Sequence, residues 1–328
     1  MIRSLLALAC ACLVCPLAGA GGFHLVALGV GGGLSTDNLT SYALRAEGES
    51  RYLVLDAGST LPGIDRALGQ GSFGPIDAAV LRGDTPQGHV FKHLLDSYFI
   101  SHGHLDHFAG LVIGSPDDTK KTVYGLPATL EMLSKYAFNW STWPNLTDAG
   151  VAPKVGTYHL QPEPAGESFA LGATGMAGRI FPLSHGGTPS SMLLVTYQQQ
   201  SFAYFGDTGP DAVEQSSFMA AAWRALAGEV RAGRLRGLVI ETSYPNEVPD
   251  KRLYGHLTPA WLLKELRTLE QYSGGVGALR GLPVVVSHIK PVFKSNYDVR
   301  AVIRQQLADG NDVGVRFLLM EQGERAGF

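Results

Sequence analysis

The sequence has little cysteine, and all of it lies near the amino terminus. The 328 residues include three cysteines, Cys10, Cys12 and Cys15, so the chain beyond residue 20 has none. Disulfide bonds, a thiol nucleophile and thiolate metal ligands are therefore excluded from the rest of the chain. Any metal site there must be built from histidine and carboxylate side chains.

Long apolar runs are also scarce, and the clearest one accompanies the cysteines. Arg3 precedes an apolar stretch over 5–15, and the small residues Ala18-Gly19-Ala20 follow it. This order is typical of a secretory signal peptide; a buried N-terminal strand is the alternative. We predict a signal peptide over 1–20, a single domain over 21–328, and a periplasmic or secreted protein. No other stretch is long and apolar enough to cross a membrane, so we expect no membrane contact after cleavage.

Basic charge is the third feature in short supply. The chain has 26 basic and 29 acidic residues, with no run of five or more basic ones. Removal of Arg3 with the signal peptide leaves 25 basic residues and a net charge near −4 with neutral histidine. This balance argues against a nucleic-acid polymer as the partner, because such binding needs clustered cations. At 45% hydrophobic residues, the chain can still bury a substantial core.

One short stretch concentrates metal-binding side chains. It reads Ser101-His102-Gly103-His104-Leu105-Asp106-His107, with three imidazoles and a carboxylate within six residues. Histidine nitrogen and carboxylate oxygen both suit zinc or manganese. Because His102 and His104 are two residues apart, they share a face of an extended segment but diverge on a helix. A β-favouring run over 97–100 precedes the stretch and an apolar run over 108–113 follows it, which predicts a strand, a metal-binding turn and a helix.

Three further candidate ligands each follow a β-like run. They are His185, Asp207 and His288. Each is ordinary by itself, since a lone histidine is more often a surface or satisfied core residue than a ligand. Together with the first cluster they supply five histidines and two aspartates. This set is large enough for two metal ions with three terminal ligands each and one shared carboxylate.

The remaining pattern alternates strands with helices. A glycine-rich segment over 29–33 follows the first strand, but Leu34 replaces the third glycine of a dinucleotide-binding loop and no helix pattern follows. No repeat or low-complexity linker divides the chain, and we predict an α/β fold with two sheets between helix layers. The predicted strands span 23–28, 42–44, 52–58, 179–185, 192–197, 201–207, 237–241, 282–288 and 313–319, and the predicted helices span 127–136, 217–231, 260–272 and 297–307.

The ligand series resembles that of the metallo-β-lactamase superfamily. The match begins with His102-Gly103-His104-Leu105-Asp106-His107 and continues through His185, Asp207 and His288. The resemblance implies an αββα sandwich of two mixed sheets between helix layers, with a binuclear zinc site. It also implies that His102, His104 and His185 bind one metal, that Asp106, His107 and His288 bind the other, and that Asp207 bridges them.

Further motifs are similar to those of the class II cyclic-nucleotide phosphodiesterases. They are the continuation over 108–116, Ile240 to Asn246, Gly255-His256-Leu257-Thr258-Pro259, and Ser287-His288-Ile289-Lys290-Pro291. Phe108 departs from the aliphatic residue usual in that family, but it leaves the ligands unchanged. The resemblance implies hydrolysis of 3′,5′-cyclic AMP or cyclic GMP to the 5′-nucleotide by a metal-bridging hydroxide that attacks phosphorus. Two Zn²⁺ ions are expected, with Mn²⁺ or another divalent metal as the alternative.

Several residues receive roles beyond metal binding. We predict that His256 protonates the leaving 3′-oxygen, because it precedes a capped helix and a similar histidine lies near the metals in related phosphodiesterases. The alternative is an ordinary histidine in a turn. We predict that Glu241 orients His256, and that Asn38 and Lys290 contact phosphate or sugar. We also predict that Asp106, a metal ligand at the reacting centre, is a catalytic residue.

Other functions share this set of ligands. A β-lactamase is disfavoured because its most familiar subclass carries arginine where His107 stands and uses a cysteine ligand. A tRNA-processing ribonuclease is disfavoured by the predicted export and the absence of a basic arm. Thioester hydrolysis and a non-catalytic metal-binding protein remain alternatives. The sequence determines neither base preference nor oligomeric state, and it allows a homodimer.

Overall fold

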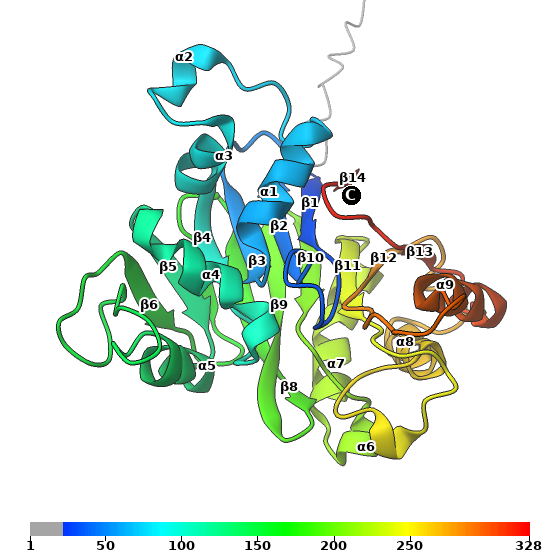
Figure 1. Cartoon of the computed structure of the whole chain (residues 1–328). Coiled ribbons are helices and arrows are strands. Elements are labelled where there is room, and N and C mark those ends of the chain that lie inside the picture. Colours follow the sequence, from blue (N-terminus) through cyan, green and yellow to red (C-terminus); the bar gives the residue numbers. More distant parts are fainter. Residues whose placement is uncertain (1–21) are drawn as a thin grey trace, which may run out of the picture.

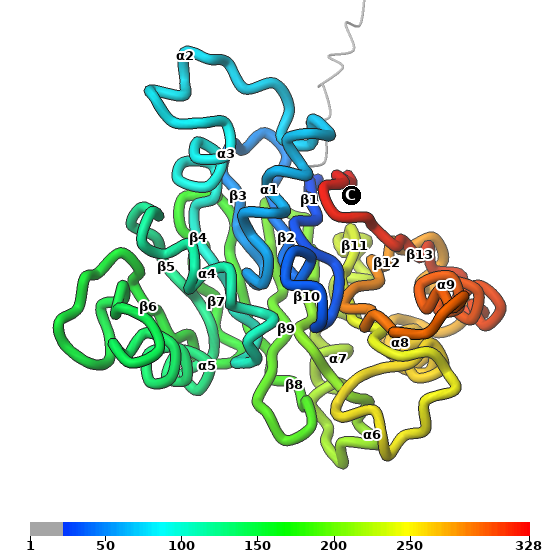
Figure 2. The backbone as a smooth tube through the Cα atoms, viewed as in Figure 1, coloured from blue at the N-terminus to red at the C-terminus, as the bar shows by residue number. Residues whose placement is uncertain are grey.

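The computed structural model describes residues 22–328, and within them two seven-stranded β-sheets pack face to face (Figure 1). The predicted signal peptide over 1–20 lies outside the described residues. The chain builds most of the first sheet before it enters the second, as the colour sequence along the tube shows (Figure 2).

The first sheet has the strand order β14-β1-β2-β3-β4-β5-β6. Pairing is antiparallel from β14 to β3 and parallel from β3 to β6. The predicted strands over 23–28, 42–44 and 52–58 are confirmed, whereas β5, β6 and β14 have no predicted counterpart. The bounds are β1 Phe23–Gly29, β2 Ser41–Ala46, β3 Tyr52–Ala57, β4 Leu95–Phe99, β5 Lys121–Gly125, β6 Tyr158–Pro162 and β14 Arg325–Gly327.

The second sheet has the order β13-β12-β11-β10-β9-β8-β7. Strands β7 to β10 pair antiparallel, and β10 to β13 pair parallel. All six strands predicted in this region are confirmed, and β7 adds an edge strand that was not among them. The bounds are β7 Ser168–Ala170, β8 Ala177–His185, β9 Thr188–Tyr197, β10 Gln200–Phe205, β11 Leu235–Glu241, β12 Pro283–Ser287 and β13 Arg316–Leu318.

Helices α8 and α9 begin where the sequence supplies capping side chains. Thr258 Oγ1 accepts a hydrogen bond from Trp261 N at the start of α8, and Asp298 Oδ1 accepts one from Ala301 N at the start of α9. No helix within residues 22–328 has the length and apolar character that a membrane crossing needs. The bounds are α1 Thr60–Gly69, α2 Ala78–Leu81, α3 Pro86–His89, α4 Ala109–Gly114, α5 Pro127–Met132, α6 Asp211–Glu214, α7 Phe218–Arg231, α8 Pro259–Tyr272 and α9 Val299–Gly310, with single turns η1 Val90–Leu94, η2 Leu105–His107, η3 Ser115–Asp117, η4 Leu133–Ala137 and η5 Asp250–Arg252.

The core forms three layers. Tyr42 and Phe99 of the first sheet pack with Phe202 and Tyr204 of the second, between the sheets. Helices α1 and α4 cover the outer face of the first sheet, and α7, α8 and α9 cover that of the second. Because most strands are buried on both faces, they read as nearly continuous apolar runs. The predicted αββα sandwich is confirmed.

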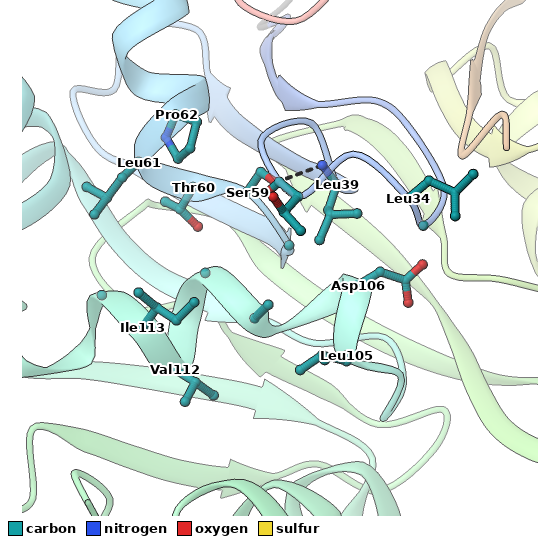
Figure 3. Close-up of a pocket in the computed structure, with 16 residues that line it drawn as sticks. Leu34, Leu39, Ser59, Thr60, Leu61, Pro62, Leu105, Asp106, Val112 and Ile113 are labelled. Atoms are coloured by element: carbon teal, nitrogen blue, oxygen red, sulfur yellow. Dashed lines mark hydrogen bonds between the residues drawn. The ribbon is translucent and has the colours of Figure 1, made fainter. Parts of the chain in front are cut away.

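The first helix layer contains an apolar cavity of about 750 Å³. It lies between the loop that carries Leu34, the start of α1 and the helix α4 (Figure 3). Its lining is almost wholly apolar, and Asp106 stands at one end of it. The cavity therefore adjoins the segment that was predicted to bind metal.

A buried ion pair secures β5. Lys121, which is 5% exposed, pairs with Asp118, and its Nζ also donates to the carbonyl of Phe91 at 2.8 Å. The hydroxyls of Tyr98 and Tyr158 donate to the same carboxylate at 3.0 and 2.8 Å. The pair is therefore enclosed and well supplied with hydrogen bonds.

Replacing Lys121 by methionine is expected to destabilise the protein, because Asp118 would be left as a buried charge without its cation. A loss of about 3–5 kcal/mol in the free energy of unfolding is expected, measured by denaturant titration. Arg267→Ala is the matched control, since its partner Asp312 is 61% exposed and such pairs contribute up to about 1 kcal/mol. Equal losses in the two variants would contradict the prediction.

Candidate metal centre

All seven predicted ligands meet at one edge of the two sheets, where strands end. β4 leads into the stretch that carries His102 to His107, β8 ends at His185, and β10 and β12 are followed by Asp207 and His288. His104 is exposed and Asp106 is partly exposed, while the other five side chains are buried. The strand ends thus bring together residues that are far apart in the sequence.

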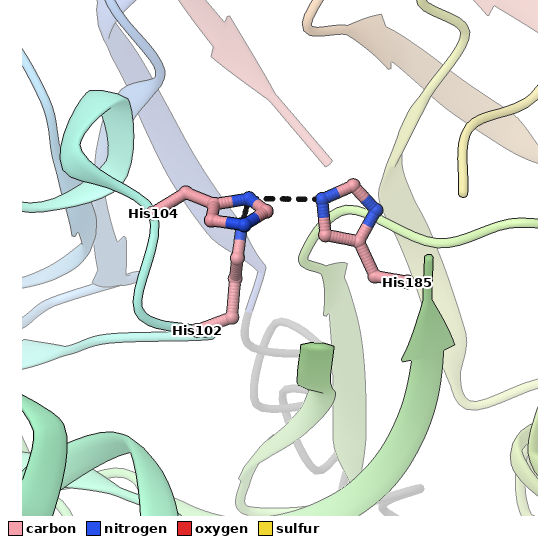
Figure 4. Close-up of side chains that lie close together, drawn as sticks. All are labelled: His102, His104 and His185. Carbon is pink, nitrogen blue, oxygen red and sulfur yellow. Dashed lines mark hydrogen bonds between the residues drawn. The ribbon is translucent and has the colours of Figure 1, made fainter. Parts of the chain in front are cut away.

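His102, His104 and His185 form the first group (Figure 4). Nδ1 of His104 lies 3.1 Å from Nε2 of His102 and 3.0 Å from Nε2 of His185. The opposite nitrogens are held from outside: His185 Nδ1 donates to the carbonyl of Gly255 at 2.7 Å, and His102 Nδ1 donates to Ser101 Oγ at 3.0 Å. Each of these two rings therefore turns its other nitrogen inward.

Asp106, His107 and His288 form the second group. Nε2 of His288 lies 3.2 Å from Oδ2 of Asp106. Nδ1 of His107 donates to Oδ2 of Asp56 at 2.7 Å, and Nδ1 of His288 donates to Ser243 Oγ at 2.9 Å. Both histidines again direct Nε2 toward the centre.

Asp207 lies between the two groups, as a shared ligand would. It is 2% exposed, and one of its oxygens approaches histidines of both groups. From Oδ2, the distances to Nε2 are 3.1 Å for His288, 3.4 Å for His107, 3.7 Å for His185 and 3.9 Å for His102. This position is compatible with the predicted bridging role.

The donor set fits divalent metal ions. Because the outer nitrogens of His102 and His185 carry protons, their inner nitrogens carry lone pairs, and both face Nδ1 of His104. His104 has at most one proton at that nitrogen to satisfy two lone pairs. Nε2 of His107 is buried and has no hydrogen-bond partner among residues 22–328. Cations would satisfy these lone pairs, and no cysteine is needed.

The electrostatics of the first group favour neutral imidazoles. Burial lowers the pKa of His185 to about 4, and burial together with the neighbouring His107 lowers the pKa of His102 well below its usual value. Both rings are therefore neutral near pH 7, the state in which imidazole binds a metal.

The carboxylates of the centre are ionised. Burial by itself would raise the pKa of Asp207, but the charges of His288 and His107 hold it well below its usual value. The pKa of Asp106 is likewise lowered against burial, by its hydrogen bond to His288 and by His107. Two anions among five imidazoles make a site that attracts cations.

Asp56 is a functional residue that sequence reasoning missed. Its two oxygens accept four hydrogen bonds, from Ser101 N, Ser101 Oγ, His107 Nδ1 and Tyr204 Oη, at 2.6–2.7 Å. Since Ser101 Oγ in turn accepts from His102, Asp56 orients one histidine of each group. Its backbone has φ +53°, a left-handed conformation that is uncommon outside glycine. The available signal was a carboxylate at the end of a buried strand, the same feature that pointed to Asp207.

Replacing Asp56 by asparagine is expected to weaken metal binding about 10–100-fold, because the amide nitrogen cannot accept the hydrogen bonds that orient the histidines. Competition with a chromophoric chelator measures this change. Asp312→Asn, at an exposed carboxylate, is the matched control. Metal affinity within about twofold of the unmodified protein would show that packing alone orients the rings.

His256 and Glu241 lie directly beside the two groups. His256 Nδ1 donates to Oε1 of Glu241 at 2.7 Å and lies 3.7 Å from Oδ2 of Asp207. Burial would lower the pKa of His256, but the charge and hydrogen bond of Glu241 raise it above the usual value. Ser243, also missed, donates to Glu241 at 2.7 Å while it accepts from His288. The predicted pairing of Glu241 with His256 is present.

The two predicted substrate contacts lie outside the clustered ligands. Asn38 uses its side-chain oxygen to accept from Val30 N at 3.0 Å, which braces the loop after β1. Lys290 follows His288 closely, and its charge acts against protonation of His256, so it lies near the centre. Contact of either residue with substrate stays a prediction.

Comparison with known proteins shows similarity to one family over most of the chain. The model of the family described as cAMP phosphodiesterases class-II matches residues 75–323. A Yersinia pestis protein named "Probable 3′,5′-cyclic-nucleotide phosphodiesterase" is 53% identical over 306 residues, which cover 93% of this chain and 89% of that protein. A 3′,5′-cyclic-nucleotide phosphodiesterase of Aliivibrio fischeri is 44% identical over 309 residues, which cover 94% of this chain and 93% of that protein.

Solved structures agree on the fold. The crystal structure of unliganded yeast PDE1 has a TM-score of 0.81 at 24% identity, and the match covers 93% of this chain and 99% of that one. The metallo-β-lactamase fold protein YhfI from Bacillus subtilis has a TM-score of 0.60 at 15% identity, with 94% and 99% covered. At these identities the likeness concerns the fold.

Proposed function

Because this chain belongs to the family of class-II cAMP phosphodiesterases, we propose that it hydrolyses cyclic AMP, cyclic GMP or both to 5′-nucleoside monophosphates. The matched segment, residues 75–323, contains all seven predicted ligands as well as Glu241 and His256. The observation that carries the proposal is that these side chains converge at one site. Relatives that align with more than nine tenths of this chain are named as phosphodiesterases.

Two divalent cations would be held at this site. His102, His104 and His185 would hold one, and Asp106, His107 and His288 the other, with Asp207 shared. Zn²⁺ suits a set of imidazole and carboxylate ligands, and Mn²⁺ is the alternative. When bound, the cations would supply a water nucleophile of lowered pKa and neutralise charge on the phosphate.

His256 would supply the proton that the leaving group needs. Hydrolysis joins the oxygen of water to phosphorus and breaks the bond to the 3′-oxygen, which must be protonated to leave as an alcohol. Since Glu241 engages Nδ1 of His256, Nε2 is the nitrogen available to that oxygen. Glu241 also raises the pKa of His256, so the ring is protonated more readily near neutral pH.

The remaining expectations rest on the sequence. In this proposal the chain has a signal peptide over 1–20 and one catalytic domain over 21–328. The mature protein acts in the periplasm or after secretion. Its partner is a small cyclic nucleotide rather than a nucleic-acid polymer or a membrane. A homodimer is compatible with this proposal.

Purified protein loaded with Zn²⁺ tests the function. We expect it to convert cyclic AMP or cyclic GMP to the 5′-monophosphate, to lose that activity with a chelator, and to regain it when Zn²⁺ is restored. A β-lactam and a glutathione thioester serve as comparison substrates, since these reactions use similar sites. Turnover of either one, without turnover of a cyclic nucleotide, would overturn the proposal, as would metal binding with no turnover.

A further inference from the structure

The apolar cavity of the first helix layer has no part in the chemistry described above. Its volume of about 750 Å³ lies within the range of roughly 300–1,000 Å³ that is usual for small-molecule sites. Its walls are formed largely by aliphatic side chains, including Leu34, Leu39, Leu105, Val112 and Ile113 (Figure 3). Such a lining suits an apolar or flat aromatic group.

The cavity reaches one of the predicted metal ligands. Asp106, a predicted ligand, stands at its end near Leu34, as Figure 3 shows. The loop that carries Leu34 packs on a second predicted ligand, because a Cβ at Gly32 would lie 2.5 Å from the ring of His288. A molecule that fills the cavity would therefore adjoin the reacting centre.

Aliphatic side chains at the cavity are unusually exposed. Leu34, Leu105 and Ile113 are 61%, 67% and 64% exposed. A single exposed leucine needs no explanation, but three around one hollow form a patch that gains free energy when covered. The group that covers them should be apolar over much of its surface.

The walls of the cavity are preformed, and few of their polar groups are available to form hydrogen bonds with a ligand. Ser59 Oγ donates to Thr36 O and accepts from Leu39 N, both at 2.7 Å, so this hydroxyl is fully engaged. The hydroxyl of Thr60 is buried within the wall. Thr36 is exposed at the cavity, and its hydroxyl can both donate and accept, so it can pair with either purine.

We propose that this cavity is the subsite for the nucleobase of the cyclic nucleotide, an inference that rests on the proposed function and deepens it. A cyclic nucleotide has an anionic phosphate at one end and a flat, largely apolar base at the other. The phosphate would lie at the metal centre, which divalent cations would make positively charged, and the adjoining apolar cavity accepts the base. Few side chains in the lining can form hydrogen bonds with the edges of the base. Adenine and guanine therefore bind there with similar affinity.

The double variant Leu34→Ala with Ile113→Ala tests the subsite. Both side chains are mostly exposed, so folding should be retained, which thermal melting verifies. The substrates are cyclic AMP, cyclic GMP and methyl ribofuranoside 3,5-cyclic phosphate, which has a methyl group in place of the base. Val276→Ala is the matched control, since Val276 is 99% exposed and is not part of the cavity lining.

We expect KM for both cyclic nucleotides to rise about tenfold, because the base loses apolar contacts. The value of kcat should change less than about twofold, and kcat/KM for the base-free substrate should stay unchanged, since neither depends on base binding. Calorimetry should show weaker binding of 5′-AMP and 5′-GMP by a similar factor.

Three results would overturn the subsite. They are an unchanged KM for cyclic nucleotides, an equal loss on the base-free substrate, and conversion of a dimer to a monomer without a change in KM, which would make the cavity part of a subunit interface. These results all presuppose an active wild-type protein. If the wild-type protein itself fails to hydrolyse cyclic nucleotides, the proposed function fails, and the subsite fails with it.

Discussion

Replacing Asp207 by alanine is expected to abolish most of the activity, with kcat/KM for a cyclic nucleotide falling about 10³-fold or more. The reason is that one carboxylate oxygen lies within 3.9 Å of histidine nitrogens from both groups. Its loss would remove the shared anion of the proposed pair of cations. Metal content, measured by elemental mass spectrometry, should fall from two ions per chain to one or fewer.

Asp312→Ala is the control for this experiment. Asp312 is an aspartate of the same charge, but its carboxylate is exposed and pairs with Arg267 at the surface. This variant should keep both metal ions and the turnover of the wild-type protein. The interpretation of Asp207 would be wrong if its alanine variant retained two metal ions and activity within tenfold of the wild-type value.

Replacing His256 by alanine is expected to lower kcat about 10²–10⁴-fold while the metal ions are retained. Bis(p-nitrophenyl) phosphate separates a proton donor from a ligand, because nitrophenolate leaves without a proton. Its hydrolysis should fall less than tenfold in the same variant. Loss of metal, or an equal loss on both substrates, would contradict the role of His256 as the acid.

Glu241→Gln tests the pH dependence of the same step. The carboxylate raises the pKa of His256 in the folded protein, so the protonated, active form persists until the pH rises through that raised pKa. Without the negative charge the pKa falls, and kcat should begin to decline at a pH lower by about one unit. An unchanged pH profile would show that Glu241 does not control the protonation of His256.

The metal ligands could be predicted because their signals are local. Four of them lie within six residues between the strand β4 and the helix α4, and each of these elements has its own pattern of residues. His185, Asp207 and His288 could be predicted because each follows a β-like run. Such a run is recognised from residues that are adjacent in the sequence. The capped helix predicted over 260–272 is present as α8, and Thr258 is the residue that caps it.

The residues that orient the ligands could not be predicted in the same way. Asp56 contacts Ser101 and His107 across 45 and 51 residues. Ser243 contacts His288 across 45 residues. A serine or aspartate at a strand end is common, and its partner depends on which strands become neighbours. The strand β14 could not be predicted for the same reason, because it pairs with β1 at the other end of the chain.

The sequence by itself determined the chemistry available to this protein: histidine and aspartate ligands, no cysteine beyond residue 20, and a family of hydrolases that uses such ligands. Only the tertiary structure decided which nitrogen of His107, His185 and His288 faces inward, because a partner that is distant in the sequence holds the other nitrogen. It also decided that an apolar cavity adjoins Asp106. Its walls come from separate loops and helices, and a hollow between them leaves no periodic pattern in the residues that line it.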